Sequence, residues 1–279
     1  MTRPDLFIGV VSHRGSRFAV SQGPQGLAAL LEAELATAGI ATTVVVSTDD
    51  HFDASPFPLS EASVQASLSA QLRLHGTWAR FIGRRWSPRW LAEQALRSGK
   101  RQTQRVRSPG VAMLRRLLNI ELSHVDLMRR GLASGAAWVL IIEDDGAASD
   151  VADCAAGLRG LMEHADRIAY ANVSQSYSSR TLGVDHLLHA DPGVRWAGTV
   201  SRGLFAADRP VTNTVCAILY AREFLPGLVR VMDELPMEPV VPIDWKLNLA
   251  MMRLFDEGAF AERRCWQVEP APIDQLSMR

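Results

Sequence analysis

Short apolar runs and helical patterns alternate along the first fifty residues. The run LFIGVV at 6–11 predicts a buried strand, and apolar positions recur with helical spacing from Gly26 to Ala38, before Gly39. A second run, ATTVVV at 41–46, predicts another strand. Strand, helix and strand in this order are typical of a doubly wound α/β sheet, so we expect a nucleotide-binding fold in the N-terminal half.

A longer helical pattern occupies residues 108–135. Its apolar positions fall on one face: Val111, Leu114, Leu118, Leu122, Val125 and Leu132. Arg116, Asn119 and Ser123 form a polar stripe beside that face, and we expect them to line a ligand site, with surface decoration as the alternative for Asn119 and Ser123. His124 lies away from the stripe, which favours a structural hydrogen bond over chemistry.

The polarity changes abruptly in WVLIIEDDG, residues 138–146, where five apolar residues lead directly into three acids. A continuous apolar run predicts a strand covered on both faces, which places Glu143, Asp144 and Asp145 at its C-terminal end, where open α/β sheets bind ligands. Three neighbouring carboxylates repel one another unless a cation offsets their charge, and their hard oxygens suit Mg²⁺ or Mn²⁺ with phosphate as a co-ligand. The stretch therefore predicts a metal diphosphate site, and the alternative is a solvated loop after a strand.

Composition and missing motifs narrow the class of protein. The chain has 279 residues, of which 47% are hydrophobic, enough for a single α/β domain over 1–279. Its 30 basic residues balance 30 acidic ones, so we expect no nucleic acid partner. The sequence has no GxGxxG after the first strand, no GxxxxGK and no GxSxG, which removes the specific support for a dehydrogenase, a P-loop protein or a hydrolase.

The cysteines and the hydropathy bear on location. The three cysteines are odd in number, far apart and without CxxC spacing, which fits a reducing cytoplasm. The first apolar run is too short for a secretory signal, and the longest uncharged stretch, 131–142, is too short to span a membrane. Frequent Ala and Arg indicate a GC-rich bacterial source. We expect a cytoplasmic protein.

A basic, tryptophan-rich segment occupies about residues 73–107. It contains ten Lys or Arg residues and a single acid, and Trp78, Ile82 and Trp86 recur at every fourth position. On a helix these three would form an apolar ridge among cations, which is typical of membrane-surface or protein-docking segments. Two alternatives are a solvated insertion whose tryptophans cover the main core, and a set of arginines that fold over a diphosphate. If the segment binds a membrane surface, we expect the protein to be peripheral to the inner face of the membrane.

Several segments together resemble glycosyltransferase family 25, the lipooligosaccharide-type galactosyltransferases. The most distinctive is ELSHVDLMRRGLASGAAWVLIIEDDG, with a Leu-Ser-His on a helix before a strand that ends in Glu-Asp-Asp. Further similar segments follow the family's order: IGVVSHRGSRF, VTNTVCAILYAREF, VPIDWKL and VEPAPIDQLS. The chain departs from the family where residues 118–121 replace its glycines and cysteine, and in the basic insertion.

The resemblance implies a GT-A-like enzyme, with a doubly wound mixed sheet flanked by helices and a nucleotide-binding half followed by an acceptor-binding half. Such an enzyme transfers a sugar from a nucleotide diphosphate donor with a divalent metal, Mn²⁺ or Mg²⁺. By position, Asp145 would contact the metal, with Glu143 as a second ligand or donor contact. The expected donor-binding residues are Ser12, Arg14, Arg17, Asp49, Asp50, Arg116, Asn119, Ser123, Glu143 and Asp144.

Asp244 is the expected catalytic base of an inverting transfer. It lies in the segment that resembles the family's Pro-x-Asp, at the start of a helical pattern, where an ordinary helix N-cap is the alternative. Trp245 is expected to stack on the acceptor, although tryptophans are more commonly buried in a core. Asn213 and Thr214 are further acceptor-binding candidates by position alone.

These expectations define the partners and two rival functions. The partners are a nucleotide-sugar donor and a glycan or small-molecule acceptor. A nucleotidyltransferase shares the nucleotide, metal and acidic strand end, but usually has a glycine-rich basic loop that SHRGSR at 12–17 matches poorly. A non-catalytic scaffold would bind nucleotide or glycan without turnover.

Overall fold

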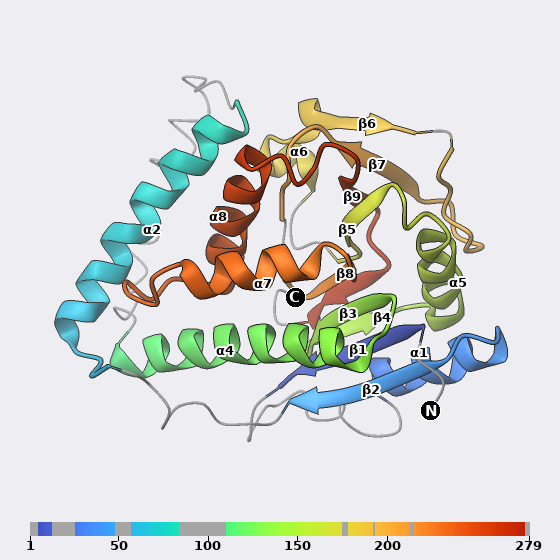
Figure 1. Cartoon of the computed structure of the whole chain (residues 1–279), viewed down its shortest axis with the longest axis horizontal. Coiled ribbons are helices and arrows are strands. Elements are labelled where there is room, and N and C mark those ends of the chain that lie inside the picture. The colour runs from blue at the N-terminus through green and yellow to red at the C-terminus, as the bar shows by residue number, and fades with distance from the viewer. Residues whose placement is uncertain are drawn as a thin grey trace.

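An eight-stranded sheet with helices on both faces forms the centre of the protein in a computed structural model (Figure 1). The structure describes residues 5–12, 26–47, 57–83, 110–174, 178–191, 193–212 and 215–276. The α/β class expected from the sequence is confirmed, and the mixed sheet is compatible with a Rossmann-like arrangement.

The sheet has the strand order β2-β1-β3-β8-β5-β9-β7-β6. Its strands are β1 Leu6–Val11, β2 Thr42–Ser47, β3 Trp138–Glu143, β5 Ile168–Asn172, β6 Leu188–Ala190, β7 Gly203–Ala207, β8 Ala217–Ala221 and β9 Arg264–Glu269. Strands β1, β2 and β3 are parallel, β8 runs against both β3 and β5, and β7 runs against β6 and β9. A separate pair, β4 Gly146–Ala148 and β10 Ile273–Gln275, is antiparallel.

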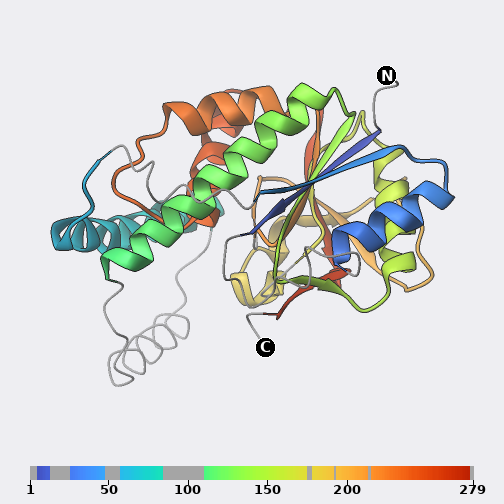
Figure 2. The same cartoon turned by 90° about the horizontal axis from the view of Figure 1, so that it is seen from below.

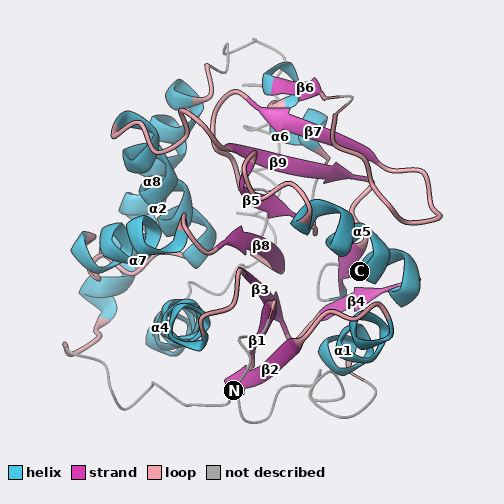
Figure 3. Ribbon diagram, turned by 45° about the vertical axis from the view of Figure 1, so that its right-hand side comes forward, coloured by secondary structure: helices cyan, strands magenta, loops and turns pink. Residues whose placement is uncertain are grey.

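Two sets of helices cover the two faces of the sheet (Figure 3). Helices α1 (Leu27–Thr37) and α5 (Val151–Met162) pack on one face. Helices α4 (Val111–Ser134), α7 (Leu225–Glu234) and α8 (Ile243–Asp256) pack on the other, and α2 (Glu61–Phe81) lies outside them against α4 and α8. Two short helices, α6 (Ser179–Leu182) and the 3₁₀ turn η3 (Asp185–Leu187), precede β6.

The alternation of side chains along β3 determines on which face of the sheet Glu143 lies. Val139 and Ile141 belong to the core beneath α4, α7 and α8, whereas Leu140 and Ile142 belong to the core beneath α1 and α5. Successive side chains of a strand point to opposite faces, so Glu143 emerges on the face of Val139 and Ile141. That face carries α4 and α8.

Close packing of α4 on the sheet depends on two positions without side chains. A Cβ on Gly131 would lie 2.7 Å from Cγ2 of Val139, nearer than real Cβ contacts allow. On β1, a Cβ on Gly9 would lie 3.2 Å from Cβ of Leu127 in α4. These glycines therefore let α4 approach β1 and β3 closely, and its far half extends beyond the sheet to α2 (Figure 2).

The basic segment begins inside a helix and contributes to the core. Residues 73–81 are the last part of α2, which starts with a capping box at Ser60. Trp78 and Ile82 are buried in the core shared with α8, so the interpretation of the tryptophans as core covering is confirmed for Trp78. Neither residue is available for an exposed docking ridge, and Trp86 lies outside the described residues. Among the helices that the structure describes, none has the length and apolar character needed to span a membrane.

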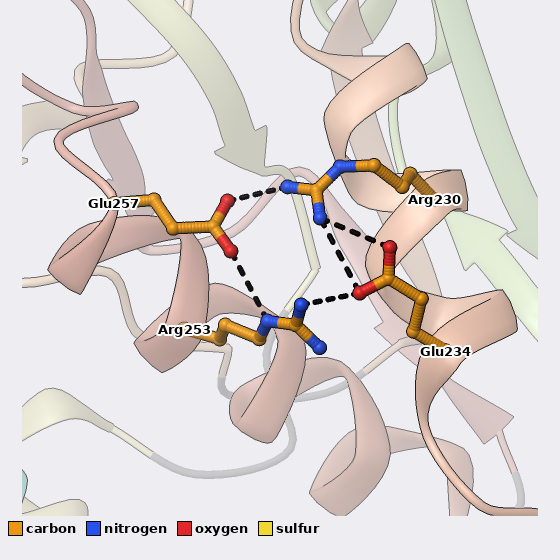
Figure 4. A network of polar contacts seen from close by, with 4 residues as sticks. All are labelled: Arg230, Glu234, Arg253 and Glu257. Carbon is orange, nitrogen blue, oxygen red and sulfur yellow. Dashed lines mark hydrogen bonds and ion pairs between the residues drawn. The ribbon is translucent and has the colours of Figure 1, made fainter.

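A square of alternating charges links the exposed sides of α7 and α8 (Figure 4). Arg230 pairs with Glu234 at 3.2 Å and also with Glu257, while Arg253 pairs with Glu257 at 3.1 Å and also with Glu234. The hydrogen bond from Arg230 lowers the pKa of Glu234. Because all four side chains are substantially exposed, solvent weakens each pair, and the network contributes little to stability.

We expect Gly131→Ala to lower the free energy of unfolding by about 1–3 kcal/mol, because the added methyl group overpacks the contact with Val139. Urea denaturation followed by circular dichroism measures this change. Gly76→Ala in α2 is the matched control, since nothing lies within 4 Å of its Cβ position and alanine favours helix. Equal stability of the two variants would contradict the role of Gly131.

Candidate functional site

The predicted acids lie at the C-terminal end of β3, beside the end of β1. Ser12, directly after β1, donates its hydroxyl hydrogen bond to Oδ2 of Asp144 at 2.8 Å. The backbone nitrogen of Asp144 donates to the carbonyl of Val11 at 3.0 Å. The structure therefore brings together two of the expected donor-binding residues, Ser12 and Asp144, at the edge where parallel strands end.

Glu143 is held between two side chains from distant parts of the chain. Nε2 of His124 on α4 lies 3.5 Å from Oε1, and Nε2 of Gln275 on β10 lies 3.4 Å from Oε2. The predicted hydrogen-bonding role of His124 agrees with this contact, but its partner is the acidic cluster itself. The sequence places both residues in segments that resemble the family, and only the fold shows that they meet at Glu143.

Asp145, two residues after Glu143, is 6% exposed. Its Oδ1 lies 3.8 Å from Sγ of Cys216, and its backbone carbonyl accepts a hydrogen bond from the nitrogen of Leu276 at 2.9 Å. Burial, followed by the charges of Glu143 and Asp145, raises the pKa of the Cys216 thiol, so this cysteine stays protonated. The three acids thus have three different environments, and the side chain of Glu143, 16% exposed, is more accessible than Asp145.

The C-terminal strand that supplies Gln275 is anchored by a buried ion pair. Arg202 donates to the carbonyls of Pro270 and Ala271 at 2.7 and 3.1 Å, and its Nε donates to Asp153 at 3.0 Å. Asp153, at the start of α5, also accepts a hydrogen bond from the backbone nitrogen of Val200 at 2.8 Å. Burial opposes ionisation of Asp153, but these hydrogen bonds outweigh it and lower its pKa. The approach to β10 is therefore fixed by a charged side chain that spans two loops.

Asp244 occupies the first turn of α8, and the charge of Glu143 affects the pKa of its carboxyl. Burial raises the pKa of the Asp244 carboxyl to about 6; hydrogen bonds from the backbone nitrogens of Trp245 and Asp244 itself oppose the shift, and the charge of Glu143 adds to it. The N-cap of α8 is Pro242, so the alternative in which Asp244 is an ordinary N-cap is wrong. A carboxylate with a raised pKa is a better proton acceptor than an ordinary aspartate.

Trp245 is packed mainly against α2. Its ring centroid lies 5.5 Å from that of His75 and 6.2 Å from that of Trp78, which meets it edge to face. Packing is therefore shown for this tryptophan, and stacking on an acceptor stays a prediction. Six other expected site residues lie outside the described residues: Arg14, Arg17, Asp49, Asp50, Asn213 and Thr214.

The predicted polar stripe of α4 is divided by the structure. Arg116 is exposed, whereas Asn119 and Ser123 are buried, so surface decoration is wrong for the latter two. The hydroxyl of Ser123 has no hydrogen-bond partner among the described residues. A buried hydroxyl without a partner is unfavourable in the protein alone and is compatible with a polar ligand or a water molecule at this position.

Sequence reasoning missed a buried ion pair next to this site. Glu121 on α4 and Lys246 on α8 are joined at 2.5 Å, and their side chains are 5% and 4% exposed. Glu121 lies on the apolar side of its helix, and a buried acid there signals a partner on a neighbouring element. The sequence alone does not identify that partner, because it is 125 positions away.

The carboxylates at the end of β3 could supply only some of the ligands that a metal ion needs. Among the described residues, no group of three or more His, Cys, Asp or Glu side chains could hold an ion. Glu143 and Asp145 provide carboxylate oxygens of the type that Mg²⁺ and Mn²⁺ prefer. Such ions commonly bind one or two carboxylates together with substrate phosphates and water, so the residues fit an ion that arrives with a diphosphate.

The chain matches no protein-family model, and no curated protein matches it significantly in sequence.

We expect Asp244→Asn to stabilise the protein at neutral pH. Because Asp244 binds its proton more tightly in the folded than in the unfolded chain, stability falls as the pH rises from about 4 to about 6 and stays reduced above that range. Removing the titratable group should raise the free energy of unfolding at pH 7 by up to about 3 kcal/mol and flatten this slope. Urea denaturation at several pH values tests it.

Asp256→Asn, at the exposed far end of the same helix, is the control for this measurement and should leave the slope unchanged. If Asp244→Asn retained the wild-type slope between pH 4 and pH 6, a raised pKa at Asp244 would be ruled out.

Proposed function

We propose that the protein is a glycosyltransferase that moves a sugar from a nucleotide diphosphate donor to an acceptor hydroxyl, with Asp244 as the base. The observation that carries the proposal is Asp244, a half-buried carboxyl whose pKa is raised to about 6 and on which the charge of Glu143, at the end of β3, acts. This arrangement combines an acidic strand end suited to a diphosphate with a separate proton acceptor.

The donor would bind at the ends of β1 and β3. Ser12 and Asp144 are linked by a hydrogen bond there, and Glu143 is oriented by His124 and Gln275. We propose Asp145 and Glu143 as the residues that would hold Mn²⁺ or Mg²⁺ with the donor phosphates. A bound divalent ion would offset the negative charge that develops on the departing nucleotide.

The proposed transfer releases one proton from the acceptor hydroxyl and therefore needs one proton acceptor. The acceptor hydroxyl gives its proton to Asp244 as its oxygen bonds to the anomeric carbon, and the bond from that carbon to the diphosphate oxygen breaks with its electrons on the leaving nucleotide. Attack from the side opposite the leaving group inverts the configuration. Burial of Asp244 supports this role, because a carboxylate removed from water accepts a proton more readily.

The sheet supports a GT-A-like architecture without being specific to it. The acid-bearing strand β3 lies between parallel β1 and antiparallel β8, and the strands of both halves belong to one sheet. Asp244 follows β8 and α7 in the chain, so it comes from the second half, as expected for an acceptor-binding part.

We expect Asp244→Asn to lower the rate of nucleotide release from a panel of nucleotide diphosphate sugars with Mn²⁺ by about 10²–10⁴-fold. Donor affinity, measured by calorimetry, should stay close to that of the wild type, because the base lies on the acceptor side. Asp256→Asn is the matched control. Wild-type turnover in Asp244→Asn would rule out this residue as the base.

Asp145→Ala tests the donor side separately. We expect this change to weaken both donor binding and activation by Mn²⁺, because it removes one of the two proposed metal carboxylates. Unchanged turnover would reject Asp145 as a ligand.

Donor binding by the wild type without hydrolysis or transfer would favour a scaffold, and pyrophosphate release from nucleoside triphosphates would favour a nucleotidyltransferase.

The pH profile of the reaction gives an independent prediction. If ionised Asp244 is the base, kcat/KM should rise about tenfold per pH unit below pH 6 and level off above it, because the free enzyme must lose the Asp244 proton first. Initial rates between pH 4.5 and about 8 measure this profile. A plateau that extends down to pH 4.5 would contradict a base with a raised pKa.

A further inference from the structure

A buried ion pair joins the first turn of α8 to the middle of α4. Nζ of Lys246 lies 2.5 Å from Oε1 of Glu121, and both side chains are almost completely buried. Oε2 of Glu121 has no hydrogen-bond partner among the described residues. The pair therefore has a bare oxygen at one end, which burial alone would disfavour.

This pair is a poor source of stability. Desolvation raises the pKa of Glu121 even though Lys246, through its charge and its hydrogen bond, acts to lower it. Two apolar side chains of similar volume would fill the same space without desolvating two charges, and such replacements are often neutral or stabilising. The position of Lys246 in the first helical turn is also unfavourable, because the positive end of the helix dipole lies there.

The pair is next to the proposed base and on the helix that orients the acids. Lys246 follows Asp244 by two residues in α8, and Glu121 precedes His124 by three residues in α4, which is nearly one helical turn. His124 contacts Glu143, so the same segment of α4 contacts the acidic strand end and the helix that carries Asp244. Trp245, between the base and Lys246, packs on His75 and Trp78 of α2.

Apolar packing leaves the rotation of α8 weakly specified. The helix rests on the core through Leu247, Met251 and Leu254, and apolar contacts have no direction. Oδ1 of Asn248 accepts a hydrogen bond from the backbone nitrogen of Thr212 at 3.1 Å, which orients the helix beyond its first turn. A short ion pair does have a direction.

We propose that Glu121 and Lys246 are positioning residues that fix the rotation of the first turn of α8 and so set the position of the Asp244 carboxyl. The pair would thereby orient the base that accepts the proton of the acceptor hydroxyl, and this role rests on the proposed function. The pair itself touches no substrate.

The test replaces both charges together by Glu121→Met with Lys246→Met. This double variant keeps the volume and the net charge, so it should melt at or above the wild-type temperature. We expect kcat to fall about 10- to 100-fold with the donor KM unchanged, because the donor contacts on β1 and β3 are left in place. A matched control replaces the exposed pair between α4 and α7, with Arg129→Met and Asp233→Met, and should alter neither parameter.

A second readout does not depend on turnover. The carboxyl carbon of Asp244, assigned by its absence in Asp244→Asn, is titrated by NMR in protein with ¹³C-labelled aspartate. In the double variant the midpoint should fall from about 6 toward the ordinary aspartate value, because a loosened first turn admits water to the carboxyl. If the double variant does not fold, Glu121→Leu with Lys246→Met, which also removes both charges and the hydrogen bond between them, is measured in the same way.

The outcomes separate the two proposals. A lowered midpoint in a folded variant supports the positioning role even if the wild type transfers no sugar, in which case only the proposed function fails. An unchanged midpoint in a folded variant overturns the positioning role, whatever the turnover.

Discussion

The close packing of α4 against β1 and β3 is the constraint on which the site depends. Without side chains at Gly9 and Gly131, the helix lies near enough to the sheet for His124 to reach the carboxylate of Glu143. The same helix carries Glu121 to Lys246 on α8. A single element therefore sets two distances: from the acidic strand end to its hydrogen-bond partner, and from α4 to the helix that bears Asp244.

Much of the fold could be predicted because it follows from local patterns. The strands at 6–11 and 138–143 and the helices at 111–134 and 243–256 occur where apolar periodicity predicts them. The spacing of Trp78 and Ile82 is compatible with a helix, but it covers only the end of α2, which begins at Glu61. Contacts between distant elements, such as Gln275 with Glu143, could not be predicted, because periodicity describes one element at a time.

The electrostatics of the site are consistent with function at the expense of stability. Four charged residues of this region have little or limited exposure to water. The side chains of Glu121 and Lys246 are buried, and Glu143 and Asp244 are partly buried. Charges in such places are disfavoured unless paired, and the raised pKa of Asp244 is a direct expression of that penalty. By contrast, the ion pairs between α7 and α8 are exposed, where charges remain hydrated.

The contacts that close the acidic site join residues that are far apart in the chain. Ser12 and Asp144 are separated by 132 positions, and so are Glu143 and Gln275. Long loops must close before such contacts form, so they are expected late in folding, after local helices and hairpins. The strand β10 has only three residues, and a short strand at the margin of a fold opens at lower free energy than the core does. Local opening of β10 would therefore release Gln275 from Glu143 while the eight-stranded sheet stays intact.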